Sequence, residues 1–593
     1  MTCKPDRAYP LLSALALALL LWAGPVGDLR AERPPSPRLL PETTVAMLSV
    51  VDATELRERF MDSSTGRMSQ DPQVKPLVDH IYMSLTQAVA EARERIGLSL
   101  PELLAIPQGE CTLALVAQPE TTPAVVLLLD VGDQVSNGRR LLERVAAFLE
   151  QSGGSKTEET VEGTKLAIYE RVGGRARRVA FFEKDATIVV GSDPAVLKQL
   201  LVVWNGGKGK TLADNSNFAT IMQRCRAAEG GRPQLVAYVD PVGIMRGVGE
   251  GNPAVQMALA MLPVLGFDGV LGAGASMTYD VGNCESILHA HLLLDSPRTG
   301  VLKMIAMRSG DMTPEPWVPS DVVGYTTLHW DVDTTYKTLA KVYDSIRGEG
   351  ALGQLLQQRI AEPTGINFEK EILKALDGRV TIVSWIERPI TLQSQASLVG
   401  LKLSDASLVE KALEKLAAKN EGTLTTQTHA GKKYYQVKMP TRVEELPPNQ
   451  RPPLPCFGVL DGYLLAANRV GLLQQVITTS TNRSKSLDGE LEFKLIVGKI
   501  GRLAGGDKPA MIGFQRPEES MRFMYDLANA ESTRTRLSER AKNNRFFAAL
   551  DSALKSYPLP PFSVFQRYLA PGGAYMIDDQ TGVHYTAFSM RRK

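Results

Sequence analysis

The sequence contains a loop of glycine and lysine residues, Gly207-Lys208-Gly209-Lys210-Thr211, whose composition is typical of phosphate-binding loops. A P-loop has the pattern Gly-x-x-x-x-Gly-Lys-[Ser/Thr] between a strand and a helix, because its backbone N–H groups wrap around the phosphates. In this chain Trp204 occupies the position of the first glycine, and the loop follows an apolar helical stretch. The pattern therefore favours a solvated loop over a nucleotide site.

Two groups of residues have types and spacings that could hold a metal ion. His289 and His291 alternate on one expected strand and so share a face. His329, Asp331 and Asp333 would share a face if their strand continued through all three. Imidazole and carboxylate groups are common metal ligands, but no third ligand accompanies the histidine pair. We expect an exposed or half-buried sheet face around that pair, and we predict no metal site in either group.

Ser552 and Lys555 have the Ser-x-x-Lys spacing, which places a lysine base one helical turn after a serine nucleophile. The companion motifs of that enzyme class are missing, and the chain has neither Gly-x-Ser-x-Gly nor His-Glu-x-x-His. With six histidines in all, acid–base catalysis would fall on carboxylates, and no pair of carboxylates stands out. We therefore predict a protein that is not an enzyme and has no cofactor, with a hydrolase as one alternative.

The overall composition is that of a folded globular protein. Of the 593 residues, 44% are hydrophobic and 22% are charged. The 67 basic and 65 acidic residues leave a net charge of +2, without the clustered basic face that binds nucleic acid. We therefore expect no nucleic-acid partner.

The N-terminus has the pattern of an export signal. Lys4 and Arg7 precede the apolar run Leu11–Ala23, and Gly24-Pro25 follows it, as in a secretory signal peptide. The run is shorter than the roughly 20 apolar residues of a membrane span, and an uncleaved signal anchor is the alternative. We predict a signal peptide over residues 1–31, a periplasmic or extracellular location, and no membrane span after the signal segment.

Four cysteines follow the leader: Cys111, Cys225, Cys284 and Cys456. In an oxidising compartment they could form bridges with any of three connectivities, and the sequence does not choose among them. Their wide spacing and the lack of Cys-x-x-Cys indicate neither a disulfide scaffold nor a redox or zinc motif. We expect most of them to be small buried apolar side chains.

The elements that would position these residues occur twice in the same order. The stretch Asp185–Met222 contains an apolar strand, an apolar helix, a polar loop and then Phe218, and Asp461–Val497 repeats this order up to Phe493. Each half mixes neighbouring strands with isolated helices and closes with a hairpin. This arrangement predicts an α+β fold, in two tandem copies of a module built on mostly antiparallel sheet with long amphipathic helices.

The repeat predicts the organisation of the chain. The expected parts are the signal peptide (1–31), a Pro-rich spacer (32–39), a first α+β repeat (40–296), a linker (297–318) and a second α+β repeat (319–593). The second copy has extra residues over Pro517–Pro560, which we expect to lie outside the shared core.

Three features resemble those of a family of bacterial exported proteins known only as a domain of unknown function. They are Pro41-Glu42-Thr43-Thr44-Val45 after the signal peptide, the Asp71-Pro72 helix start, and the strand–helix element Asp185–Leu201. The resemblance implies an exported location and a fold, and it supplies no catalytic residues.

Export and duplication together suggest an exported, non-catalytic cell-envelope protein that acts by binding a partner, either an envelope protein or an apolar ligand. The alternative is a carrier of an apolar ligand or lipid, because sheets covered by amphipathic helices can enclose an apolar pocket. Strands such as Val125–Leu129 are apolar on both faces, which burial on both sides would explain equally well.

Overall fold

The computed structural model describes residues 33–88, 98–118, 121–171, 177–226, 230–249, 252–438 and 453–592. The expected signal peptide lies outside these ranges. The chain folds into two compact units. Unit 1 comprises residues 1–260, 270–293 and 540–558, and unit 2 comprises residues 261–269, 294–539 and 559–593. In the described ranges, no helix combines the length and the apolar character that crossing a membrane requires.

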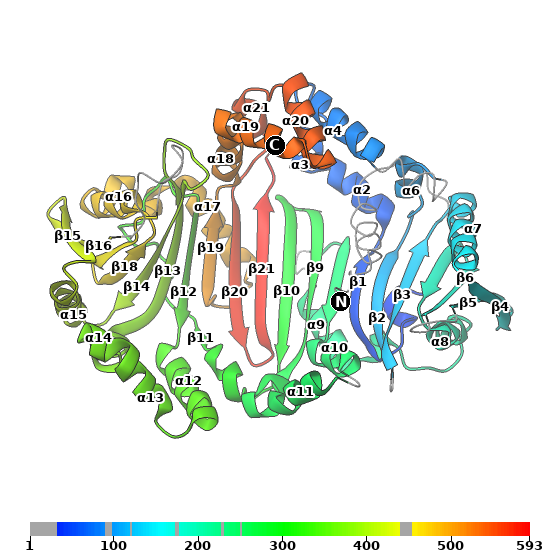
Figure 1. Cartoon of the computed structure of the whole chain (residues 1–593), viewed down its shortest axis with the longest axis horizontal. Coiled ribbons are helices and arrows are strands. Elements are labelled where there is room, and N and C mark those ends of the chain that lie inside the picture. The colour runs from blue at the N-terminus through cyan, green and yellow to red at the C-terminus, as the bar shows by residue number, and fades with distance from the viewer. Residues whose placement is uncertain are drawn as a thin grey trace. The chain divides into compact units, whose positions relative to one another are not determined.

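The fold is α+β, with a large antiparallel sheet (Figure 1). In unit 1 the strands lie in the order β10-β9-β8-β1-β2-β3-β7-β6-β5-β4. Their bounds are β1 (Thr44–Val50), β2 (Cys111–Gln118), β3 (Thr121–Asp130), β4 (Gly154–Val161), β5 (Thr164–Arg171), β6 (Arg177–Lys184), β7 (Thr187–Gly191), β8 (Leu235–Val239), β9 (Val270–Val281) and β10 (Cys284–Leu294).

The helices of unit 1 come from both ends of the sequence. They are α2 (Ala53–Asp62), α3 (Ser64–Ser69), α4 (Lys75–Ala88), α6 (Leu100–Ala105), α7 (Val135–Gln151), α8 (Pro194–Trp204), α9 (Ser216–Arg224), α10 (Pro241–Val248) and α20 (Arg545–Ser556). Helix α11 (Pro253–Leu265) is divided between the two units. α20 comes from the expected insertion and packs against α4. The long helix expected after Asp71 is described only as α4, because residues 89–97 lie outside the described ranges.

Helix α8 shows how the sequence builds the core of unit 1. The Asp193 side chain caps it by accepting a hydrogen bond from the Ala195 N–H at 2.7 Å, and Pro194 occupies the first helical position. Its apolar stripe is buried: Val196, Leu197, Leu200 and Leu201. Gly191 ends β7 directly under this helix, where a Cβ would lie 2.2 Å from Leu197 Cδ1. α8 and α9 thus contribute to one core cluster on the sheet.

In unit 2 the strands lie in the order β21-β20-β19-β12-β13-β14-β18-β17-β16-β15. Their bounds are β12 (Gly324–Trp330), β13 (Leu376–Ile386), β14 (Gln395–Leu403), β15 (Leu424–His429), β16 (Lys432–Val437), β17 (Cys456–Leu460), β18 (Tyr463–Ala467), β19 (Met511–Gln515), β20 (Gly572–Asp579) and β21 (Gly582–Met590), with the short β11 (Met307–Arg308) beside β12.

The helices of unit 2 are α12 (Val332–Arg347), α13 (Ala351–Leu356), α14 (Glu362–Thr364), α15 (Ala406–Lys419), α16 (Val470–Thr481), α17 (Leu491–Leu503), α18 (Pro517–Asn529), α19 (Glu531–Ala541, whose last residues fall in unit 1) and α21 (Phe562–Gln566). α16 buries the stripe Leu472, Leu473, Val476 and Ile477. Phe493 on α17 contacts Phe514 on β19 edge to face, with ring centroids 5.5 Å apart.

The segments that we expected to be a spacer and a linker both contain buried residues. Residues 33–39 of the expected spacer contain a 3-10 turn, Ser36–Arg38, and bury Ser36 and Leu39. The expected linker 297–318 contains β11 and ends on the buried Trp317 and Val318. Proline suppresses regular structure in both segments, but their apolar ends and charged side chains hold them against the sheets.

Most of the cysteines are buried, as expected. Cys225, Cys284 and Cys456 are buried and Cys111 is half-buried. Burial raises the pKa of the Cys225 and Cys456 thiols to about 12. Because the thiolate is the reactive form, we expect these two thiols to be unreactive.

Candidate functional site

The glycine–lysine loop does not form a phosphate site. It follows α8 and is largely exposed up to Lys210, whose Nζ lies 3.4 Å from a Glu42 carboxylate oxygen. The Thr211 hydroxyl, which a P-loop would offer to a metal ion, donates to the Asp214 carboxylate at 2.8 Å. The two polar side chains that a phosphate site would use, Lys210 and Thr211, are therefore engaged with carboxylate groups of the chain.

The histidine and aspartate candidates do not converge on a metal site. His289 and His291 are both buried on β10, contrary to the exposed or half-buried face that we expected. β12 ends at Trp330, and Asp331 caps α12 by accepting from the Thr334 N–H at 3.0 Å.

The change from strand to helix separates the three candidates of that group. His329 Nε2 lies 2.9 Å from the Asp311 carbonyl oxygen, and Asp333 pairs with Lys337 at the surface. Among the residues that the structure describes, no three His, Cys, Asp or Glu side chains come together as metal ligands.

The Ser-x-x-Lys pair lies on α20 and lacks the geometry of a nucleophile and its base. The Lys555 ammonium group binds the Asp551 carboxylate at 2.7 Å. The Ser552 hydroxyl lies 3.5 Å from His80 Nε2, on the exposed side of α4. The lysine is therefore held by an aspartate one turn before it, away from a role as the base of Ser552.

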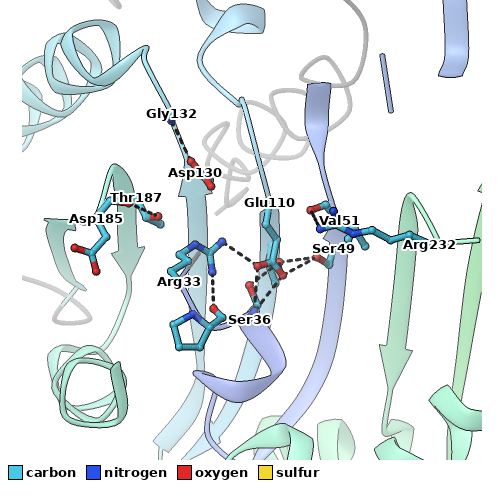
Figure 2. A network of polar contacts seen from close by, with 12 residues as sticks. Arg33, Ser36, Ser49, Val51, Glu110, Asp130, Gly132, Asp185, Thr187 and Arg232 are labelled. Atoms are coloured by element: carbon cyan, nitrogen blue, oxygen red, sulfur yellow. Dashed lines mark hydrogen bonds and ion pairs between the residues drawn. The ribbon is translucent and has the colours of Figure 1, made fainter. Parts of the chain in front are cut away.

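The structure shows a buried polar cluster in unit 1 that the sequence analysis did not identify. We call Arg33, Ser36, Ser49, Glu110 and Thr112 the unit 1 cluster. Arg33 Nη2 lies 2.9 Å from Glu110 Oε2, and the Ser36 N–H donates to both carboxylate oxygens at 3.1 and 3.2 Å. Figure 2 shows Arg33 and Ser36 directed at Glu110 from the segment that precedes β1. The cluster fixes this segment on the sheet.

The hydroxyl groups of the unit 1 cluster extend it across two strands. The Ser49 and Thr112 hydroxyl oxygens lie 2.7 Å apart, and the Ser36 hydroxyl donates to that of Thr112 at 2.9 Å. Ser49 and Thr112 are directly opposite each other in the β1–β2 register. The Glu110 carboxylate and the three hydroxyl groups all have partners within the protein, which indicates a structural role, whereas Arg33 Nε has no hydrogen-bond partner among the described residues.

Unit 2 has a similar buried cluster, formed by Glu315, Tyr325, Thr327, Arg379 and Thr381, which we call the unit 2 cluster. Arg379 Nε lies 2.9 Å from Glu315 Oε1, and the two side chains are only 5% and 2% exposed. The Tyr325 hydroxyl donates to Glu315 Oε2 at 3.1 Å, and Arg379 Nε donates to the Thr327 hydroxyl at 3.1 Å. Burial, followed by the charge of Glu315, holds the pKa of Tyr325 well above its ordinary value. Glu315 thereby anchors the segment that precedes β12.

The sequences around the two clusters share one feature that could have indicated a buried charge. Each sheet-side charge follows a glycine and directly precedes an apolar run of its strand, as in Gly109-Glu110 before β2 and Gly378-Arg379 near the start of β13. A charged residue at the start of a strand that is otherwise covered requires a partner. Its partner could not be chosen from the sequence, because it lies in a distant proline-rich segment.

The carboxyl group of Asp130, at the end of β3, is expected to make the stability of the fold depend on pH. Burial raises the pKa of this carboxyl, while a hydrogen bond from the Gly132 N–H at 3.0 Å and the charge of Arg33 oppose the rise. Because the pKa is raised in the folded state, the contribution of Asp130 to stability is fully present below its unfolded pKa and is lost as the pH rises through its folded pKa. Asp130→Asn, which keeps the acceptor, should therefore raise the melting temperature more at pH 7 than at pH 3.5. Exposed Asp133→Asn is the control, and equal shifts of Asp130→Asn at both pH values would contradict the prediction.

One face of the unit 1 sheet carries exposed apolar side chains. Leu48 on β1 lies opposite Leu113 on β2, and Leu115 lies opposite Val125 on β3. Leu48 is 54% exposed, and Leu113 and Val125 are also exposed. The alternate residues of the same strands point into the core cluster to which α8 and α9 contribute. Burial on both sides, which would have explained the apolar strand Val125–Leu129 without a ligand, therefore does not hold at Val125.

The unit 2 sheet has a similar face. Ile382 on β13 and Val399 on β14 lie opposite each other, and both are exposed. A pocket of about 210 Å³ beside them is lined by Ile382 but also by Ser384 and Arg516. Arg516 is already held, since its Nε donates to Glu492 at 3.1 Å. The mixed lining differs from the apolar cavity that a lipid carrier requires.

Residues 338–504 match the model of a family described as "Protein of unknown function (DUF3352)". This match confirms the resemblance to a family of unknown function. It runs from α12 to α17 in unit 2, whereas the three features that carried the resemblance lie between residues 41 and 201. Neither the comparison with curated proteins nor the comparison with solved structures finds a match.

Proposed function

We propose that this chain is an exported, non-catalytic envelope protein made of two copies of one α+β module, and that it binds a partner protein through the uncovered face of its sheets. The uncovered apolar face at Leu48, Leu113 and Val125 carries the binding proposal. Exposed apolar clusters on soluble proteins commonly mark sites of interaction. The candidate nucleophile, phosphate loop and metal ligands lie elsewhere, each engaged or dispersed as described above.

The two strand orders support the proposed duplication. When β1–β10 are matched in sequence order to β12–β21, the strand pairings within unit 1 recur within unit 2, where β12 pairs in addition with β11. The helices follow the same correspondence, since α8 contacts β6 and β7 and α16 contacts β17 and β18. The segment before the first strand is bonded to the same loop in both units, by Leu212 N–H to Leu40 O at 2.8 Å and by Leu487 N–H to Val318 O at 2.9 Å.

The polar clusters also correspond by position. Ser49 and Thr112 in unit 1 match Thr327 and Thr381 in unit 2, which are likewise opposite each other and 3.3 Å apart at their hydroxyl oxygens. The charges are exchanged. In unit 1 the sheet supplies Glu110 and the preceding segment supplies arginine, whereas in unit 2 the sheet supplies Arg379 and the preceding segment supplies glutamate.

The binding proposal predicts the effect of changing the uncovered face. We expect Leu48→Gln combined with Leu113→Gln to weaken partner binding at least tenfold, because central apolar contacts carry most of the energy of an interface. The measurement is crosslinking and capture from envelope extract with the tagged exported protein, followed by titration of the captured partner. Phe148→Gln on α7, also an exposed apolar residue of unit 1, is the matched control.

The possible outcomes separate the functions. Loss of one captured protein with the double variant and its retention with Phe148→Gln would support the proposal. Equal capture by both variants would contradict it. Lipid that copurifies with the wild type and is lost in the double variant would instead favour a carrier of apolar ligands.

A further inference from the structure

Helix α11 and the residues after it form an apolar segment at the surface, which we define as residues 252–267. The segment contains no Asp, Glu, Lys, Arg or His. No residue of α11 is buried. Met257 is 72% exposed and Val264 is 57% exposed, and Met261 and Phe267 are exposed as well. Met257, Met261 and Val264 are spaced by four and three residues, so they form one stripe along the helix.

The polar side chains of this segment are used within the chain. Asn252 Oδ1 accepts from the Ala254 N–H at 3.1 Å and so caps the start of α11. Gln256 Nε2 donates to the Gly249 carbonyl oxygen at 3.1 Å. They are the only two polar side chains in the segment. The outer surface of α11 therefore presents hydrocarbon and thioether groups.

The segment is also held in place at its C-terminal end. Gly266 has φ +80° and Gly300 has φ +48°, conformations that favour glycine. A Cβ on Gly300 would lie 2.0 Å from the Leu265 carbonyl oxygen, so the two backbones touch. The exposed stripe is thus part of the folded chain with a fixed end.

We propose that the apolar segment inserts into the interface of a lipid bilayer. A helix that is apolar on all sides is normally covered, either by a protein core or by lipid. Protein interfaces carry about one hydrogen bond per 100–200 Å² and a polar rim, and the outer stripe of α11 supplies neither. Lipid requires only apolar area from its partner. This chemistry favours lipid over a protein partner or a second copy of the chain.

The length of α11 determines its orientation on a bilayer. At about 1.5 Å per residue, its 13 residues extend about 20 Å, less than the roughly 30 Å of a hydrocarbon core. The segment would therefore lie along the membrane surface, with its Met257–Val264 stripe among the acyl chains. Methionine side chains are flexible and suit such an irregular surface.

The test uses the exported protein and vesicles of phosphatidylcholine, with and without phosphatidylglycerol. We expect flotation with both kinds of vesicle, and at least about tenfold weaker binding for Met257→Gln combined with Val264→Gln. Phe148→Gln is the control for loss of an exposed apolar residue. The Leu48→Gln/Leu113→Gln variant should still float, so that failure of this inference is distinguishable from failure of the proposed function.

A second measurement does not depend on the stability of the double variant. The emission that Phe267→Trp adds to that of the native tryptophans should be blue-shifted and quenched by brominated phosphatidylcholine, with the wild type as the reference. Wild-type protein that stays away from vesicles, or an unquenched Trp at position 267, would overturn the proposal. Concentration-dependent dimerisation without lipid that Met257→Gln abolishes would also overturn it, since it would assign the segment to a contact between copies.

Discussion

Replacing Glu315 by alanine is expected to lower the free energy of unfolding of unit 2 by about 3–5 kcal/mol. Glu315 is the buried partner of Arg379, and it also accepts a hydrogen bond from Tyr325. Its removal takes away the buried charge that compensates the Arg379 guanidinium and leaves the largely exposed Asp311 carboxylate, 3.7 Å from Nη1, as its charged neighbour. Breaking a buried pair in this way costs far more than the pair itself contributes, because the desolvation of the remaining ion is no longer offset.

The measurement is urea unfolding combined with amide hydrogen exchange, which assigns the loss to a unit in a chain of two units. Asp333→Ala is the control, because it breaks an exposed pair with Lys337 on α12 and should cost less than about 0.5 kcal/mol. Replacing both Glu315 and Arg379 by leucine should recover most of the loss. A small effect of Glu315→Ala alone would show that water reaches Arg379.

Replacing Phe493 by alanine should destabilise unit 2 by about 3–5 kcal/mol, and Phe218→Ala should do the same in unit 1. Phe493 is buried between Tyr325 and Phe514, with ring centroids 5.8 and 5.5 Å away. Phe218 contacts Tyr238 edge to face at 5.2 Å. Each substitution combines the loss of a large buried ring with a cavity in a packed core.

Hydrogen exchange should localise each loss to its own unit. Phe493→Leu is expected to cost less than the alanine variant, because it fills more of the cavity. Leu491→Ala, at an exposed position of the same helix, should change stability by less than about 0.5 kcal/mol. If only one of the two phenylalanines proved important, the proposed equivalence of their positions would be wrong.

The helices that carry the core could be predicted because their apolar residues repeat with the period of a helix. The stripe on α8 and the stripe on α16 were both identified from their spacing, and the structure buries both. An apolar strand was predicted before each of them, and β7 lies between β3 and β6. Local pattern is sufficient here because burial and periodicity agree.

The polar clusters and the packed segments before each first strand could not be predicted. Arg33 and Glu315 lie in proline-rich stretches that have no periodicity, and their partners are far away in sequence. The metal hypothesis at His329 required the strand to continue, but the Asp331 side chain starts a helix instead. The exposure of Leu48 and Val125 depends on which face of the sheet the helices cover. The hydropathy of the sequence does not predict that choice.

The exchanged charges of the two clusters have a consequence for folding. If the two units are copies of one module, as proposed, they can exchange segments while they fold, which is a known failure of repeat proteins. A leading segment that docked on the wrong sheet would place Arg33 beside Arg379, or Glu315 beside Glu110, out of contact with water. Like charges opposed in this way cost several kcal/mol. The reversed charges of the two clusters would thus disfavour docking of each leading segment on the sheet of the other unit while the chain folds.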